Sequence, residues 1–466
     1  MRIRRLVLTT TAVAAAAALI IGASGAASAT TARATITGTG HGSVPGDQPL
    51  PPYTIVNPPL APATVGGQPT TVRQGTHEHA AYIIEVPPQW NGDLVMWAHG
   101  YRGNTTVLTV DPPAFGLRQK LLEQGYAWAA SSYAGNGYDI RTGVLSTKAL
   151  ADHFGELFSR PNRTYIAGVS MGGHVIGRSL EQFPRYYAGA LPLCGVMGDQ
   201  ALFDFFLDYN LAAQALAGVK SYPIPTDYLS TAVPQINAAL GIGGISVLNP
   251  EPTNDLGRQF RAITINRSGG DRPGADAAFA FWKDFLFALA VPAAEPSPDD
   301  TTAFRPGQIA TNITTKYEPN HPVNVNRKIQ RVLPENILER VSPFLTQIPQ
   351  ISGRPRVPVL SLHGLGDLFV TFSMEQEYAT DVAHRGQSKF LVQRAIRTIN
   401  HCEFSDAEVG AAWDDLVNWV ENGDRPAGDN VRNKHVVASP DYGCAFSDPA
   451  AFAAGTGTRR LFPACP

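Results

Sequence analysis

The segment from Tyr165 to His174 constrains the fold of this chain more than any other. A short apolar run of strand-forming residues leads directly into Gly168 to Gly172, with the sequence G-V-S-M-G, and a helical pattern follows. Glycines two positions before and after Ser170 leave room for a sharp strand-to-helix turn, in which the serine backbone is strained and its hydroxyl points away from the sheet. The following helix directs its N-terminal dipole at developing negative charge. The sequence therefore predicts a nucleophile elbow centred on Ser170.

Strand and helix patterns alternate on both sides of this segment. Strands are expected at 81–86, 93–98, 126–131, immediately before Ser170, and at 188–193, 357–362 and 389–394. Helices are expected at 114–124, 146–158, 373–383 and 406–420, the last opened by the capping box Ser405-Asp406-Ala407-Glu408. Such alternation predicts an α/β fold with a mostly parallel sheet and helices on both faces.

The same patterns divide the chain into five parts. Residues 199–350 interrupt the alternation with aromatic helical stretches, which predict a mainly helical cap inserted over the edge where parallel strands end and ligands bind. The other parts are a signal peptide at 1–29, an extended arm at 30–68, the α/β core at 69–198 and 351–430, and a disulfide-stapled tail at 431–466.

Composition and the first residues indicate where the chain acts. Hydrophobic residues make up 44% of the 466 residues, so a large core is feasible, and the formal net charge of −2 gives no electrostatic footprint for nucleic acid or anionic lipid. A basic start, a short apolar stretch and the site Ala27-Ser28-Ala29 are typical of a secretory signal peptide. We therefore expect secretion with cleavage near Ala29, and an uncleaved N-terminal anchor is the alternative.

Two residues downstream of the elbow complete a possible catalytic set. A serine hydroxyl is a poor nucleophile at neutral pH, so it needs a base and the base needs an orienting partner. Asp367 follows the expected strand at 357–362, and His401 follows the one at 389–394, so both should emerge at the sheet edge that carries Ser170. The order Ser, Asp, His is that of elbow enzymes. The alternatives are that Asp367 only caps a helix and that His401 is an ordinary loop histidine.

Acyl transfer also requires hydrogen-bond donors for the oxyanion. One expected donor is the backbone N–H of Met171, directly after the nucleophile. The other is the amide of Tyr101, in the His99-to-Gly103 loop that follows the strand at 93–98. The alternative for this loop is a glycine turn without a catalytic part.

Four further residues are expected near a substrate pocket. Arg102 lies beside the oxyanion loop and is a candidate partner for a substrate carboxylate, with a surface salt bridge as the alternative. Tyr133, Asn136 and Tyr138 follow a strand at the same sheet edge, where they either line the pocket or belong to a solvated turn.

Taken together, these motifs resemble a secreted α/β-hydrolase of the serine-hydrolase type. They are His-Gly at 99–100, G-V-S-M-G at the elbow, H-G-x-G-D ending at Asp367, and N-H-C around His401. The resemblance covers roughly 80–198 and 351–422. The adjacent His401 and Cys402 are also similar to tannase and feruloyl-esterase-like enzymes, in which a cysteine beside the serine is bonded to the one beside the histidine. This chain departs from that pattern, because Val169 precedes Ser170.

The four cysteines are an even number in a chain expected to be exported, so two disulfides are expected. Cys194, at the end of the strand at 188–193, is the expected partner of Cys402, and their bond would anchor the histidine loop. Cys444 and Cys465 would form the second bond. No Cys/His spacing suggests zinc, and neither a metal nor a cofactor is expected.

The resulting hypothesis is a secreted serine hydrolase that cleaves a carboxylic ester through an acyl-enzyme. His401 would accept the proton of Ser170, Asp367 would hold the imidazole, and the two amides would bind the oxyanion. An amidase or peptidase with the same triad is the nearest alternative, and a catalytically silent binding protein is another. The expected partner is a small-molecule or polymeric ester, with no nucleic acid and no stable membrane insertion.

Overall fold

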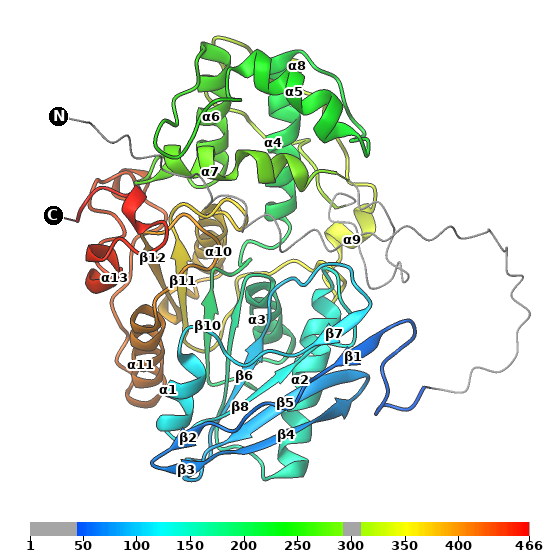
Figure 1. The fold of residues 1–466 in the computed structure, drawn as a ribbon, viewed down its shortest axis with the longest axis vertical. Helices are drawn as coiled ribbons and strands as arrows, with labels where there is room; N and C mark the ends of the chain where they lie inside the picture. Colours follow the sequence, from blue (N-terminus) through cyan, green and yellow to red (C-terminus); the bar gives the residue numbers. More distant parts are fainter. Residues whose placement is uncertain (1–43, 292–308, 466) are drawn as a thin grey trace, which may run out of the picture. The chain divides into compact units, whose positions relative to one another are not determined.

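The centre of the structure is an eight-stranded sheet in the order β12-β11-β10-β9-β6-β8-β5-β4 (Figure 1). The structure is a computed structural model that describes residues 44–291 and 309–465. The strands of the sheet are β4 (Thr71–His77), β5 (Ala80–Val86), β6 (Leu94–Ala98), β8 (Ala127–Ser131), β9 (Thr164–Val169), β10 (Gly189–Leu193), β11 (Val359–Gly364) and β12 (Leu391–Ile396). Only β5 is reversed relative to the other seven strands, so the predicted mostly parallel sheet is confirmed.

Both faces of the sheet are covered, which explains why its central strands are almost wholly apolar. In β6, Leu94 and Met96 belong to one hydrophobic core, whereas Val95 and Trp97 belong to a second core on the opposite face. Helices α2 (Ile140–Leu157), α3 (Met171–Gln182) and α10 (Ser373–His384) pack in the first core, and α1 (Leu117–Glu123) and α11 (Asp406–Asn422) in the second (Figure 1). The helix α11 begins with the predicted capping box of Ser405 and Glu408.

Between β10 and β11 the described residues form helices packed around aromatic side chains. These helices are α4 (Ala201–Ala217), α5 (Tyr228–Leu240), α6 (Asp255–Arg267), α7 (Ala275–Ala288), α8 (Val325–Lys328) and α9 (Ile337–Val341). Tyr209 of α4 contacts Phe260 of α6 and Phe287 of α7, with ring centroids 4.8 and 5.0 Å apart. We refer to the described part of 199–350 as the cap.

Several elements differ from the sequence-based expectation. Strand β4 was not predicted, because it is a polar edge strand without an apolar run. Helix α2 begins at Ile140 rather than near residue 146, because Asp139 caps it by accepting a hydrogen bond from the N–H of Thr142 at 2.9 Å. Within the expected arm, the described residues form β1 (Thr54–Val56), which pairs with β7 (Val107–Thr109), and the short hairpin of β2 (Thr64–Val65) and β3 (Gln68–Pro69). The expected signal peptide lies outside the described residues.

The tail after residue 431 is bound to the core by hydrogen bonds. Its elements are α12 (Lys434–Val437), α13 (Pro449–Ala453) and the 3-10 turn η3 (Arg459–Leu461), while a second turn, η2 (Ser388–Phe390), precedes β12. The buried guanidinium of Arg397 donates to the carbonyl oxygens of Tyr442 (3.0 Å), Pro463 (2.8 Å) and Pro440. The tail therefore stabilises the segment between β12 and His401.

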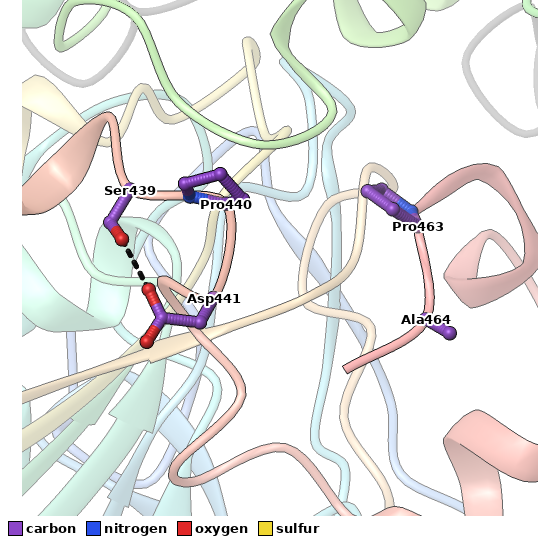
Figure 2. Close-up of a pocket in the computed structure, with 5 residues that line it drawn as sticks. All are labelled: Ser439, Pro440, Asp441, Pro463 and Ala464. Carbon is purple, nitrogen blue, oxygen red and sulfur yellow. Dashed lines mark hydrogen bonds between the residues drawn. The ribbon is translucent and has the colours of Figure 1, made fainter. Parts of the chain in front are cut away.

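A hollow of about 380 Å³ lies on the surface of the tail (Figure 2). It is lined by Ser439, Pro440, Asp441, Pro463 and Ala464. It includes none of the residues expected to be catalytic. Among residues 44–291 and 309–465, no helix combines the length and apolar content that crossing a bilayer requires.

Candidate active site

Ser170 lies in a strained turn between β9 and α3. Its backbone has φ 56° and ψ −122°, and residues other than glycine rarely adopt a positive φ of this kind. A Cβ added to Gly168 or Gly172 would lie 2.3 or 2.2 Å from the carbonyl oxygen of Ala98, so only glycine fits at either position. The turn is thus packed against the end of β6. The backbone N–H of Ser170 donates to the carbonyl oxygen of Leu193 at 3.0 Å.

Asp367 and His401 meet at the ends of the neighbouring strands β11 and β12. The Nδ1 atom of His401 lies 2.5 Å from Oδ2 of Asp367. The other carboxylate oxygen accepts the backbone N–H groups of Phe369 and Val370, both at 2.9 Å. Because the Asp367 side chain is 0% exposed and accepts at both oxygens, it fixes the proton of His401 on Nδ1. The Nε2 atom is left as the nitrogen that can accept a proton.

A disulfide connects the histidine loop to the strand beside the elbow. Cys194 follows β10, the strand paired with β9, and is bonded to Cys402, which matches the expected pairing. The Sγ atom of Cys402 lies 3.3 Å from Nε2 of His401. The two sulfurs and the imidazole form a cluster of potential metal ligands within 4.8 Å, but a disulfide supplies no thiolate for a metal. The bond therefore fixes the His401 loop to the end of β10, the strand paired with β9.

The Ser170 hydroxyl makes no hydrogen bond to the imidazole within the described residues. Catalytic hydrogen bonds are often long before substrate binds and tighten in the complex. The structure thus joins the Asp367 and His401 side chains directly and joins His401 to Ser170 through the Cys194–Cys402 disulfide and the β9–β10 pair.

The loop after β6 passes directly over the nucleophile. A Cβ added to Gly100 would lie 3.0 Å from the Cβ and 3.5 Å from the Oγ of Ser170. The N–H of the next residue, Tyr101, donates no hydrogen bond within the described residues. Met171 is the first residue of α3, so its N–H has no acceptor inside the helix. Both expected oxyanion donors are therefore unengaged near Ser170.

Comparison with known proteins places these features in context. No family model matches the sequence. The chain is 22% identical over 405 residues to an o-phthalyl amidase from Xanthobacter agilis, which covers 75% of this chain and 86% of that protein.

Two solved structures are similar at low identity. Feruloyl esterase B from Aspergillus oryzae is 15% identical, with a TM-score of 0.44 over 74% of this chain and 79% of that one. Candida antarctica lipase A is 10% identical, with a TM-score of 0.41 over 84% and 85% of the two chains.

The strand order identifies the fold. Numbered along the chain, the eight strands of the main sheet lie in the order 1-2-4-3-5-6-7-8, with only the second reversed and the nucleophile elbow after the fifth. The chain has the α/β-hydrolase fold.

Arg102, expected near the pocket, makes hydrogen bonds within the protein. Its guanidinium donates to Oγ1 of Thr109 at 2.7 Å and to Oδ2 of Asp111 at 2.6 Å. The structure shows the salt bridge that the sequence left as the alternative, and the hydrogen bond to Thr109 joins the loop at 99–103 to β7.

The three polar residues after β8 are also buried. The hydroxyl of Tyr133 donates to the carbonyl of His99 at 3.2 Å, and the amide of Asn136 donates to Thr105 and Val107 at 2.7 and 2.8 Å. The hydroxyl of Tyr138 lies 3.1 Å from Nδ1 of His174. Their relative exposures are 1%, 4% and 6%, so they are not part of the solvated turn that was the alternative, and their hydrogen bonds support the loops around Ser170.

An aromatic residue that the sequence did not single out, Phe369, contacts His401. The ring of Phe369 lies 5.0 Å from the imidazole of His401 and 4.9 Å from the ring of Phe285 in the cap. Phe206 of α4 lies 6.4 Å from Phe369. The signal available was an aromatic residue two positions after the acid, together with the aromatic stripe at 279–287.

Proposed function

We propose that this chain is a secreted serine hydrolase that cleaves a carboxylic ester through an acyl-enzyme intermediate. The observation that carries the proposal is the 2.5 Å contact between His401 and Asp367, held by a disulfide beside a strained Ser170. Secretion is supported by the two disulfides, because such bonds persist in oxidising compartments.

In the proposed reaction, Ser170 Oγ attacks the carbonyl carbon while Nε2 of His401 takes the hydroxyl proton. Buried Asp367 stabilises the imidazolium that forms. The N–H groups of Tyr101 and Met171 donate to the oxyanion of the tetrahedral intermediate. His401 then protonates the leaving alcohol, and water repeats the sequence to release the acid. No step requires a metal or a cofactor.

The surroundings of the base favour an apolar or aromatic substrate. Phe206, Phe285 and Phe369 are partly exposed and lie in one aromatic cluster beside His401. Aromatic faces add stacking to the hydrophobic gain from burying a planar group. The proposed partner is a small-molecule or polymeric ester of this character, with no nucleic acid and no stable membrane insertion.

Amide cleavage is the second candidate, because the curated protein similar to this chain is an amidase. Paired substrates distinguish the two: an aryl ester and an anilide with the same aromatic acyl group. We expect faster turnover of the ester and loss of both activities in Ser170→Ala. Faster anilide cleavage would make the chain an amidase, and a Ser170→Ala variant with wild-type turnover would overturn the proposed site.

A further inference from the structure

A tryptophan of the cap contacts both loops that carry the acid and the base. The side chain of Trp282, on α7, is buried, and its indole N–H lies 2.9 Å from the carbonyl oxygen of Ile399 and 3.1 Å from that of Gly366. Gly366 directly precedes Asp367, and Ile399 lies two residues before His401. One donor therefore bridges the two loops that bring the pair together.

The loops are already joined where they leave the sheet. The N–H of Leu365 donates to Ile396 and that of Gly366 donates to Thr398, both at 2.8 Å. A Cβ on Gly366 would lie 2.7 Å from the side chain of Ile399, so the loops are in close contact. The bifurcated indole contact adds a third link, nearest to the reacting groups.

The cap also reaches the pair through Phe369. The N–H of Phe369 donates to Asp367, while its ring makes a T-shaped contact with the His401 imidazole and packs against Phe285 of α7. The Trp282 ring lies 6.4 Å from the same phenyl ring. Both α7 side chains therefore contact Phe369, the residue whose N–H donates to the Asp367 carboxylate and whose ring contacts the His401 imidazole.

We propose that Trp282 is a positioning residue. Its indole N–H holds the loops of Asp367 and His401 in alignment, so this alignment depends on how α7 packs against the core. The inference rests on the proposed function, since it assigns a role toward the same base. Without the indole N–H, two buried carbonyl oxygens lose their donor, and the loops relax to reach other partners. A displacement of about 1 Å at a reacting group lowers turnover on the order of 100-fold.

The test compares Trp282→Phe with Trp90→Phe. Trp90 is a matched control, because its indole N–H also donates to a backbone carbonyl, that of Asp93 at 2.7 Å, and it lies in the loop that precedes β6. We expect Trp282→Phe to lower kcat and the rate of fluorophosphonate labelling by roughly 10- to 100-fold, with KM changed by less than about threefold. Trp90→Phe should leave kcat, KM and labelling at wild-type values.

Non-additivity separates positioning from general destabilisation. If Trp282 acts through Asp367, then adding Trp282→Phe to Asp367→Asn should lower kcat by less than about threefold. Additive losses, or a kcat for Trp282→Phe equal to that of Trp90→Phe, would overturn the inference. If the phenylalanine variant does not fold, Trp282 can be replaced by 3-benzothienylalanine, in which a sulfur atom takes the place of the N–H. We expect this replacement to lower kcat to the same extent. Failure of the proposed function would look different, since Ser170→Ala would then retain turnover.

Discussion

His401 and Asp367 lie 34 positions apart in the sequence, and the Nδ1 of one is 2.5 Å from the Oδ2 of the other. The contact exists because β11 and β12 are parallel neighbours in register, so the loops that follow them leave the sheet side by side. The buried carboxylate has both oxygens engaged, and its position fixes the tautomer of the ring.

Replacing Asp367 by asparagine should lower kcat by about 10⁴-fold with KM nearly unchanged. The asparagine amide can donate a hydrogen bond to Nδ1 of His401, which stabilises the tautomer that carries the proton on Nε2. In that tautomer, Nε2 cannot accept the proton of Ser170. Steady-state kinetics on an aryl ester measures the effect, with Asp414→Asn as an exposed control. A loss of less than tenfold would show that His401 does not depend on this carboxylate.

The two disulfides should differ in their effect on activity. The Cys194–Cys402 bond closes a sequence separation of 208 and contacts His401, whereas Cys444–Cys465 closes one of 21. Replacing both members of a pair by serine should cost about 5 kcal/mol of unfolding free energy for the first and about 3 kcal/mol for the second. We expect turnover to fall strongly only in the first double variant under conditions where both remain folded. Equal loss of turnover in both would contradict this assignment.

Acid should destabilise the fold partly through His174. Burial lowers the pKa of His174 to about 4, while the hydrogen bond to Pro349 opposes that shift. Between about pH 6.5 and pH 4, the unfolded chain binds a proton that the folded chain does not, so stability is full above this window and falls as the pH falls through it. For one such group the loss is about 3 kcal/mol. In denaturant titrations, the unfolding free energy of His174→Gln should depend less steeply on pH than that of the wild type. Parallel curves for the two proteins would show that His174 is not the source of the acid effect.

Gly100 should tolerate no side chain without loss of activity. A Cβ there would lie 3.0 Å from the Cβ of Ser170, so Gly100→Ala pushes the oxyanion loop away from the nucleophile. We expect kcat to fall on the order of 10- to 100-fold. Gly244→Ala is the matched control, since a Cβ at that position meets nothing within 4 Å. Unchanged kcat in Gly100→Ala would exclude this loop from the reaction.

The sequence predicted the elements whose burial leaves a pattern. The strands before Ser170, Asp367 and His401 are buried along nearly their whole length and are rich in apolar residues, because both sheet faces are covered. The ends of these parallel strands share one edge of the sheet. Strand β4 contains no apolar run. The direction of a loop side chain cannot be predicted from the sequence: Tyr133 has φ 60°, and its ring is buried in the hydrophobic core. Which aromatic residues of α7 face the base depends on how the cap packs, and periodicity alone does not encode that.

Active-site labelling tests directly whether Ser170 is the nucleophile. A fluorophosphonate reacts with a serine only when that serine is activated by a base and its oxyanion is bound, so the label reports the whole arrangement at once. We predict stoichiometric modification of wild-type protein, mapped by peptide mass spectrometry to Ser170, and none in Ser170→Ala or His401→Ala. Absence of label from folded wild-type protein, or a label mapped to any other serine, would contradict the central claim.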